Sequence, residues 1–228
     1  MENVTAALQR DRGRLGRSSA AEVVADILRE RIAEGLFVPG QRLSEESIGA
    51  ALEVSRNTLR EAFRLLGHER LLEHRLNRGV FVRVLSAEDV ADLYRVRRVI
   101  EGAAVRNGAH ASRDALAALK EAVTEASRAA GEGRWQDVGT ANIRFHQGLA
   151  ALNGSPRLDE AMRQLLAELR LVFHVMKNPR AFHEPFVARN LELVELMEAG
   201  RAAEAERALE SYLDDAEKLL MQAYIPEP

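Results

Sequence analysis

From Ser86 onward the chain alternates long amphipathic segments with short breaks, and this pattern constrains the fold more than any other feature. Apolar residues recur there at helical spacing, and no stretch shows the two-residue alternation of a strand. Six helices joined by such short loops predict an antiparallel helical bundle. The expected helices cover residues 86 to about 109, 112–130, 135–152, 156–176, 182–198 and 202–224.

The segment before Ser86 shows a different pattern. Ser19 opens a Ser-x-x-Glu capping box, which predicts a helix that ends at Gly35. Ser44 and Ser55 are in position to cap two further helices, residues 44–52 and 56–70. Two short β segments follow, residues 71–74 and 79–84, with a loop between them. Three helices followed by a two-stranded hairpin are typical of a winged helix-turn-helix.

The fold class is therefore mostly α, in two domains. The 228 residues suit one domain of roughly 80 and another of roughly 140 residues. We expect a flexible arm at residues 1–18, a winged helix-turn-helix domain at 19–85 and a helical domain at 86–228. The absence of cysteine excludes disulfides and thiolate metal sites. With no secretion signal and no apolar stretch long enough for a membrane helix, we expect a cytoplasmic protein without membrane contact.

The distribution of charge along the chain indicates more about possible partners than the net charge of −3 does. Residues 1–85 carry 14 Arg and 12 acidic residues, whereas residues 86–228 carry 18 basic and 23 acidic residues. Residues 55–83 contain seven Arg and three Glu. A basic segment in an acidic chain indicates a surface for nucleic acid, although a solvated Arg-rich face would look the same.

The start of the third helix carries side chains suited to DNA. Ser55, Asn57 and Thr58 are short hydrogen-bonding residues that can contact phosphates. Arg56 and Arg60 lie four residues apart on one face and can reach guanine edges or phosphates. Each feature has an ordinary structural explanation, since a serine often only caps a helix and an arginine pair is often only solvated.

Three sequence blocks in order make this interpretation specific. They are GLFVPGQRLSE (35–45), VSRNTLREA (54–62) and NRGVFV (77–82), and they closely resemble the GntR family of bacterial regulators. The resemblance implies that Ser55, Arg56, Asn57, Thr58 and Arg60 contact DNA, with Arg78 and Gly79 in the wing. Some relatives place a DNA-contacting Arg in the second helix, where this chain has Ser47.

The C-terminal part resembles the FadR-type ligand domain of that family, the FCD class. The matching stretches are LYRVRRVIE (93–101), NIRFH (142–146) and AGR (199–201). Six expected helices point to the VanR-like subgroup. The resemblance implies a homodimer that binds double-stranded operator DNA and a small-molecule effector.

Many FCD domains hold a divalent metal through one Asp and three His. The aligned positions in this chain are Asn142, His146, Asn190 and Tyr212. Only His146 is a good ligand for such a metal, because the carboxylate and two imidazoles are missing. We therefore predict a polar cavity without metal or other cofactor. A bound divalent metal is the alternative, and His174 or His183 could in principle restore its site.

The same residues suit a small polar metabolite. Asn142, His146, Asn190 and Tyr212 supply donors and acceptors, and Arg97 can add a positive charge for an anion. Two structural alternatives stay open, namely a buried hydrogen-bond network without ligand and, for Arg97, an ion pair with Glu101.

These observations predict a transcriptional regulator, most simply a repressor, whose helical domain binds an anionic effector. A helical-bundle enzyme is the alternative from another class, but the chain lacks HExxH, GxSxG and P-loop motifs as well as cysteine. A helical interaction module without DNA is disfavoured by the wing motif. We expect no enzymatic activity.

Overall fold

The computed structural model describes residues 19–33, 36–108, 111–176 and 178–222. The structure divides between Val82 and Arg83 into an N-terminal unit and a helical unit. The sequence placed this division between residues 85 and 86. The expected arm at residues 1–18 and the helix end at Gly35 lie outside the described residues.

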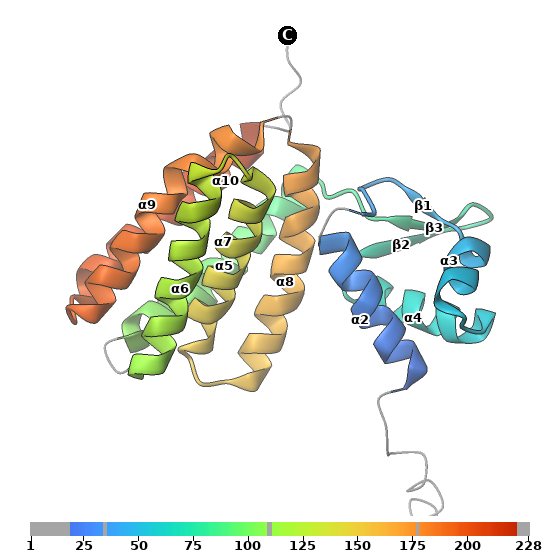
Figure 1. Ribbon diagram of the computed structural model, residues 1–228, viewed down its shortest axis with the longest axis horizontal. Coiled ribbons are helices and arrows are strands. Elements are labelled where there is room, and N and C mark those ends of the chain that lie inside the picture. The colour runs from blue at the N-terminus through green and yellow to red at the C-terminus, as the bar shows by residue number, and fades with distance from the viewer. Residues whose placement is uncertain (1–18, 34–35, 109–110, 177, 223–228) are drawn as a thin grey trace, which may run out of the picture. The chain divides into compact units, whose positions relative to one another are not determined.

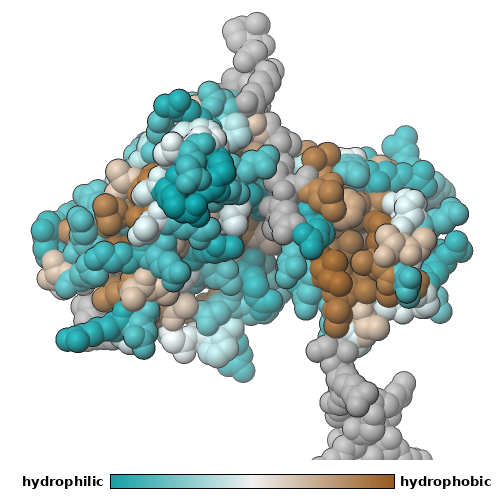
Figure 2. All heavy atoms as spheres, in the orientation of Figure 1, coloured by the Kyte–Doolittle hydropathy of each residue, from teal (hydrophilic) through white to brown (hydrophobic). Residues whose placement is uncertain are grey.

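The N-terminal unit contains three described helices, α2 (Ala20–Ala33), α3 (Glu45–Leu52) and α4 (Arg56–His68). Their starts follow local chemistry. Ser44 and Ser55 accept hydrogen bonds from backbone N–H groups three residues ahead, at 3.1 Å each. Leu59, Phe63 and Leu66 of α4 are buried, as their helical spacing predicts. In Figure 2, apolar atoms gather on this unit over the region of α2, where Val23 is 48% exposed.

The sheet of this unit has three strands, where we expected two. Strand β1 (Arg42–Leu43) pairs antiparallel with β3 (Gly79–Val82), which also pairs antiparallel with β2 (Leu72–Arg75). The expected hairpin of β2 and β3 is confirmed, and β1 is a third strand that the sequence did not predict. A segment of two residues is too short to show strand periodicity, and its pairing depends on a strand almost 40 residues later in the chain.

The helical unit contains six described helices, as expected, and Figure 1 shows them packed along one another. Their bounds are α5 (Ala87–Asn107), α6 (Arg113–Gly131), α7 (Trp135–Ala151), α8 (Pro156–Val175), α9 (Pro179–Glu198) and α10 (Ala202–Gln222). Helix α9 begins three residues before the expected start. The Asn178 side chain accepts from Ala181 N at 3.1 Å, and Pro179 takes the first helical position, where its missing N–H is tolerated.

Each helix buries an apolar face, and the surface of the helical unit in Figure 2 is mainly hydrophilic. None of the described helices is both long and apolar enough to cross a membrane. The buried polar and charged residues of the described chain all belong to the helical unit, and they are Arg97, Glu101, His146, Glu168, Arg170, His183 and Asn190. Because buried charge is unfavourable unless it is compensated, these residues are where a site should be sought.

Candidate functional site

The N-terminus of α4 combines a helix cap with exposed polar side chains. The Ser55 hydroxyl accepts from Thr58 N and lies 2.8 Å from the Thr58 hydroxyl. Asn57 is exposed between them in the sequence. Four of the predicted contact residues therefore lie at the first turn of α4, where free backbone N–H groups favour an anion such as a DNA phosphate, and Arg60 follows one turn later.

Arg56 and Arg60 both approach Glu45 of α3. Nε of Arg60 donates to the two carboxylate oxygens at 3.2 and 3.0 Å, and Nε of Arg56 lies 3.8 Å from Oε2. The Arg56 and Arg60 side chains are still 70% and 60% exposed. An exposed ion pair contributes at most about 1 kcal/mol, so DNA can take over either guanidinium at low cost. Sequence reasoning gave Glu45 no part in this surface.

The wing turn depends on two residues in the left-handed region, Asn77 with φ 58° and Gly79 with φ 104°. A Cβ at Gly79 would lie 3.2 Å from Nε of Arg42. The position therefore favours glycine both because of its positive φ and because it leaves little space for a side chain. Arg75 is anchored, since it pairs with Glu73 and its guanidinium lies 4.4 Å from the Phe81 ring centroid. Arg78 is exposed beside the turn. Among the arginines of the wing, Arg78 is thus the better placed to contact DNA.

In the helical unit, the five predicted ligand-binding residues and Glu101 form one continuous network, which is buried except at half-buried Asn142. Nε of Arg97 donates to Glu101 at 2.7 Å, and the other carboxylate oxygen lies 2.7 Å from Nδ1 of His146. Nε2 of His146 lies 3.0 Å from the Tyr212 hydroxyl. Oδ1 of Asn142 then contacts Tyr212 and accepts from Asn190 Nδ2, at 3.0 and 2.8 Å. Helices α5, α7, α9 and α10 all contribute to this network.

The network holds charge at one end and neutral groups at the other. Burial alone would lower the pKa of Arg97, but the Glu101 charge raises it. Burial alone would raise the pKa of Glu101, and the Arg97 charge brings it below its ordinary value. The pair is therefore ionised. Burial lowers the pKa of His146 and raises that of Tyr212, which keeps the imidazole and the phenol neutral.

Neutral Tyr212 has a single proton for two acceptors. Nε2 of His146 and Oδ1 of Asn142 both lie 3.0 Å from its hydroxyl, while Nδ1 of His146 must donate to the Glu101 carboxylate. Only one of the two phenol contacts can be a hydrogen bond at a time while His146 is neutral. The arrangement leaves one acceptor of the network open to another donor.

Three buried atoms around the network have no hydrogen-bond partner among the described residues. They are Nη2 of Arg97, the Tyr94 hydroxyl and Oδ1 of Asn190. Tyr94 lies beside Arg97, whose guanidinium is 4.8 Å from the Tyr94 ring centroid, and burial raises the pKa of this phenol to about 12. Buried polar atoms are normally satisfied, so two donors and an acceptor left open indicate a place for a water or a ligand.

The same donor set does not fit a divalent metal. Oδ1 of Asn142 is used by Asn190 and Tyr212, and neutral Tyr212 is a poor ligand. Among the described residues, no group of three or more His, Asp, Glu or Cys side chains could hold such an ion. His183 lies elsewhere, in contact with Phe173 and Phe182, and does not restore the site. The His174 side chain lies outside the described residues, and the absence of metal stays a prediction.

Sequence reasoning missed Tyr94 and the central position of Glu101. It treated Glu101 only as an ion-pair partner of Arg97, and that pair is present. The spacing of Arg97 and Glu101 by four residues on one helix was the signal for their contact. Nothing in the sequence shows that Glu101 also reaches His146, because the two residues are 45 positions apart and lie on different helices.

Comparison with known proteins assigns both units. The family model described as bacterial regulatory proteins, gntR family, matches residues 20–82, and that of the FCD domain matches residues 92–215. A solved GntR transcriptional regulator from Rhodococcus sp. RHA1 is 48% identical, with a TM-score of 0.85 over 91% of this chain and 100% of that one.

Curated relatives are also named as transcriptional regulators. The Nta operon transcriptional regulator of Aminobacter aminovorans is 33% identical over 135 residues, 59% of this chain and 64% of the relative, so the match spans less than two thirds of that protein. A protein of Paenarthrobacter nicotinovorans, named as a probable D-xylose utilization operon transcriptional repressor, is 28% identical over 199 residues, 86% of each chain.

Proposed function

Because the chain belongs to the GntR family of bacterial regulatory proteins and carries an FCD domain, we propose that it is a repressor that a small anionic metabolite releases from its operator. It is a DNA-binding transcriptional regulator and not an enzyme. We propose the direction of regulation, the chemical class of the effector and the residues that contact DNA. Its site of action is the bacterial cytoplasm, where the operator is.

The DNA contact is assigned to α4 and the wing. The first turn of α4 presents Ser55, Asn57 and Thr58 for phosphates. Arg56 and, one turn later, Arg60 are largely exposed and approach the partly exposed carboxylate of Glu45. The wing adds Arg78 next to Gly79. One such unit reads too few bases for useful specificity, so two copies act on a pseudo-palindromic operator as a homodimer.

The effector site is assigned to the network around Arg97, Asn142, His146, Asn190 and Tyr212. The observation that carries this assignment is the set of open polar atoms at Arg97, Tyr94 and Asn190. Nη2 of Arg97 is a charged donor with no partner among the described residues, which selects an acceptor, and Oδ1 of Asn190 selects a donor. A small hydroxy acid or another anion with a hydroxyl group meets both requirements.

The first test is DNA binding. A gel shift with fragments from the regions flanking the gene should show one retarded complex, with a slope against salt that reports the phosphate contacts. A Glu45→Gln variant should bind at least as well as the native protein, because it frees Arg56 and Arg60. Sedimentation with and without the operator fragment checks the dimer, and a protein that stays monomeric in both would contradict it.

The second test is effector binding. A thermal-shift screen of organic acids should find a ligand that stabilises the protein, by about 2.7 kcal/mol at 100 times its dissociation constant. Asn190→Ala should weaken the response to that ligand and leave operator affinity intact. Arg97→Ala is a poorer variant, because it leaves buried Glu101 without its partner, a loss of about 3–5 kcal/mol. A stoichiometric metal in the purified, untagged protein would refute the metal-free assignment.

A further inference from the structure

A second polar cavity lies in the helical unit, outside the network around Arg97. It has a volume of about 110 Å³ and forms where the first turns of α7 and α9 approach the C-terminal half of α8. Polar lining comes from Gln136, Arg170 and His183, and apolar lining from Trp135, Phe173 and Met176. The positive ends of two helices, α7 and α9, therefore border one small space.

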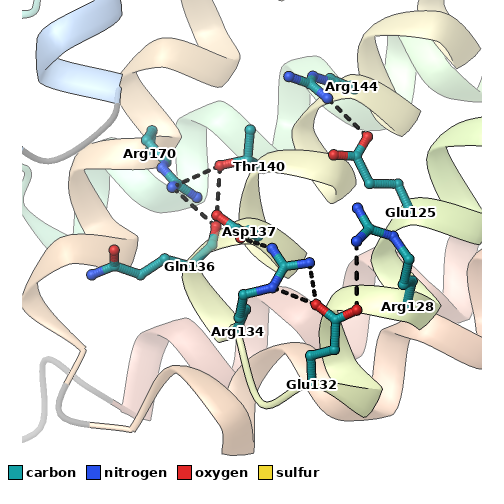
Figure 3. A network of polar contacts seen from close by, with 9 residues as sticks. All are labelled: Glu125, Arg128, Glu132, Arg134, Gln136, Asp137, Thr140, Arg144 and Arg170. Carbon is teal, nitrogen blue, oxygen red and sulfur yellow. Dashed lines mark hydrogen bonds and ion pairs between the residues drawn. The ribbon is translucent and has the colours of Figure 1, made fainter.

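Arg170 supplies a buried positive charge at this cavity. The residue is only 3% exposed. Its Nη2 donates to the Gln136 carbonyl oxygen at 3.2 Å and to the Thr140 hydroxyl at 3.0 Å, and Figure 3 shows the guanidinium directed toward both residues of α7. Burial lowers its pKa to about 10, so the group still carries its charge at neutral pH. These two contacts of Nη2 hold the guanidinium against α7.

His183 supplies a second nitrogen. It is 3% exposed and packs edge-on against Phe173 and Phe182, with ring centroids 5.0 and 4.9 Å away. Within the part of the chain that the structure describes, neither ring nitrogen of His183 makes a hydrogen bond. Burial and then the charge of Arg170 lower its pKa to about 4, so the ring is neutral at pH 7 and keeps one N–H donor.

Gly139 of α7 makes the convergence possible. A Cβ at this position would lie 2.6 Å from Nη1 of Arg170 and 2.8 Å from Nε2 of His183. Both nitrogens therefore lie beside the same point on the α7 backbone, which any larger residue would occupy. The glycine is buried within the helix, and it has no positive φ that would explain it as a turn residue.

We propose that this cavity binds a small carboxylate of roughly two to four carbon atoms, with its oxygens on Nη1 of Arg170 and Nε2 of His183. The planar fork of an arginine matches the geometry of a carboxylate. The apolar wall of Trp135, Phe173 and Met176 accommodates a short carbon chain, whereas phosphate or sulfate would place oxygens against it. This site shares no residue with the effector network and does not depend on its function.

The protein carries its own reporter for this proposal. Trp135 lines the cavity and is the single tryptophan of the chain. Sodium acetate and sodium butyrate are titrated into the full-length protein at constant ionic strength, with sodium chloride making up the difference, and Trp135 emission is followed. We expect a saturable change with butyrate, a weaker affinity for acetate, and no saturable change with chloride alone.

Matched variants locate the site. Gly139→Ala and His183→Gln should each weaken butyrate binding at least about tenfold, because each disturbs or removes a hydrogen bond to a charged group. Gly131→Ala is the control, since a Cβ at Gly131 meets nothing within 4 Å. Far-UV circular dichroism checks that each variant is folded, and His183→Gln carries the test if Gly139→Ala is not.

Three results would overturn the proposal. One is an emission change that chloride reproduces or that does not saturate. Another is butyrate binding that survives both Gly139→Ala and His183→Gln but is lost in Asn190→Ala, which would place the carboxylate at the effector network. The last is equal affinity for inorganic phosphate, which would refute the carboxylate class. Loss of the effector response in Asn190→Ala with butyrate binding intact would support two separate sites.

Discussion

Buried His183 should make the helical unit sensitive to acid. Its pKa falls from 6.5 to about 4 on folding, because burial and the neighbouring Arg170 charge disfavour the imidazolium. The unfolded chain therefore binds the proton more readily than the folded protein. The contribution to stability is complete above about pH 6.5 and is lost as the pH falls toward 4.

The expected loss of unfolding free energy follows from the size of the pKa shift of His183. One pKa unit corresponds to about 1.4 kcal/mol, so the full effect is about 3 kcal/mol, of which about 2 kcal/mol is lost between pH 8 and pH 5. His146 acts in the same direction, since burial lowers its pKa as well. The native protein should thus lose at least about 2 kcal/mol of unfolding free energy over this range.

His183→Gln isolates the contribution of His183 to the pH dependence of stability, because glutamine does not titrate. Urea unfolding of the native and variant proteins at about pH 8 and pH 5 is followed through Trp135 emission, which reports the helical unit, and through circular dichroism. The variant should lose about 2 kcal/mol less than the native protein between the two pH values. An identical pH dependence in both proteins would refute the buried, neutral state of His183.

Further predictions concern the other residues described above. Arg56→Ala and Arg60→Ala should each weaken operator binding by about 1–3 kcal/mol if the side chain reads a guanine, or lower the salt slope by about one if it contacts a phosphate, as gel shifts at several salt concentrations will show. Gly79→Ala should destabilise the wing by about 1–3 kcal/mol in thermal unfolding, because its φ of 104° is strained for alanine. Tyr94→Phe removes a hydroxyl without a partner among the described residues and should leave the free energy of unfolding unchanged or raise it. Tyr212→Phe removes a hydrogen-bonded hydroxyl and should lower that free energy by about 1–3 kcal/mol. Urea unfolding that finds Tyr94→Phe less stable than Tyr212→Phe would contradict the network.

Helix starts could be read from the sequence because capping is local chemistry. Ser19, Ser44 and Ser55 each accept a hydrogen bond from the backbone three residues ahead, as their positions predicted. The start of α9 was misplaced because Asn178-Pro179 indicates a break and a helix start equally well. Local signals identify a boundary better than they tell which side of it is helical.

Features that join distant segments could not be read in this way. Strand β1 forms only because Leu43 lies opposite Val80, and the approach of Arg60 to Glu45 depends on how α3 and α4 cross. Asn142, His146, Asn190 and Tyr212 could be grouped beforehand because they align with the metal-ligand positions of FCD domains, although only His146 keeps a ligand residue there. Their role in binding an effector stays a prediction. The cavity at Arg170 had no such pattern, since it depends on the missing side chain of Gly139 and on the packing of three helices.

The two polar clusters of the helical unit share two helices, and this has a physical consequence. On α7, Gly139, Asn142 and His146 follow at intervals of three and four residues, so they lie on one face. On α9, His183 and Asn190 are seven residues apart and also share a face. A rotation of α7 or α9 therefore moves residues of both clusters together. A carboxylate that fixes α7 against α8 and α9 at Arg170 should consequently restrict the rearrangements available to Asn142 and Asn190, and the affinities of the two sites should be coupled equally in both directions.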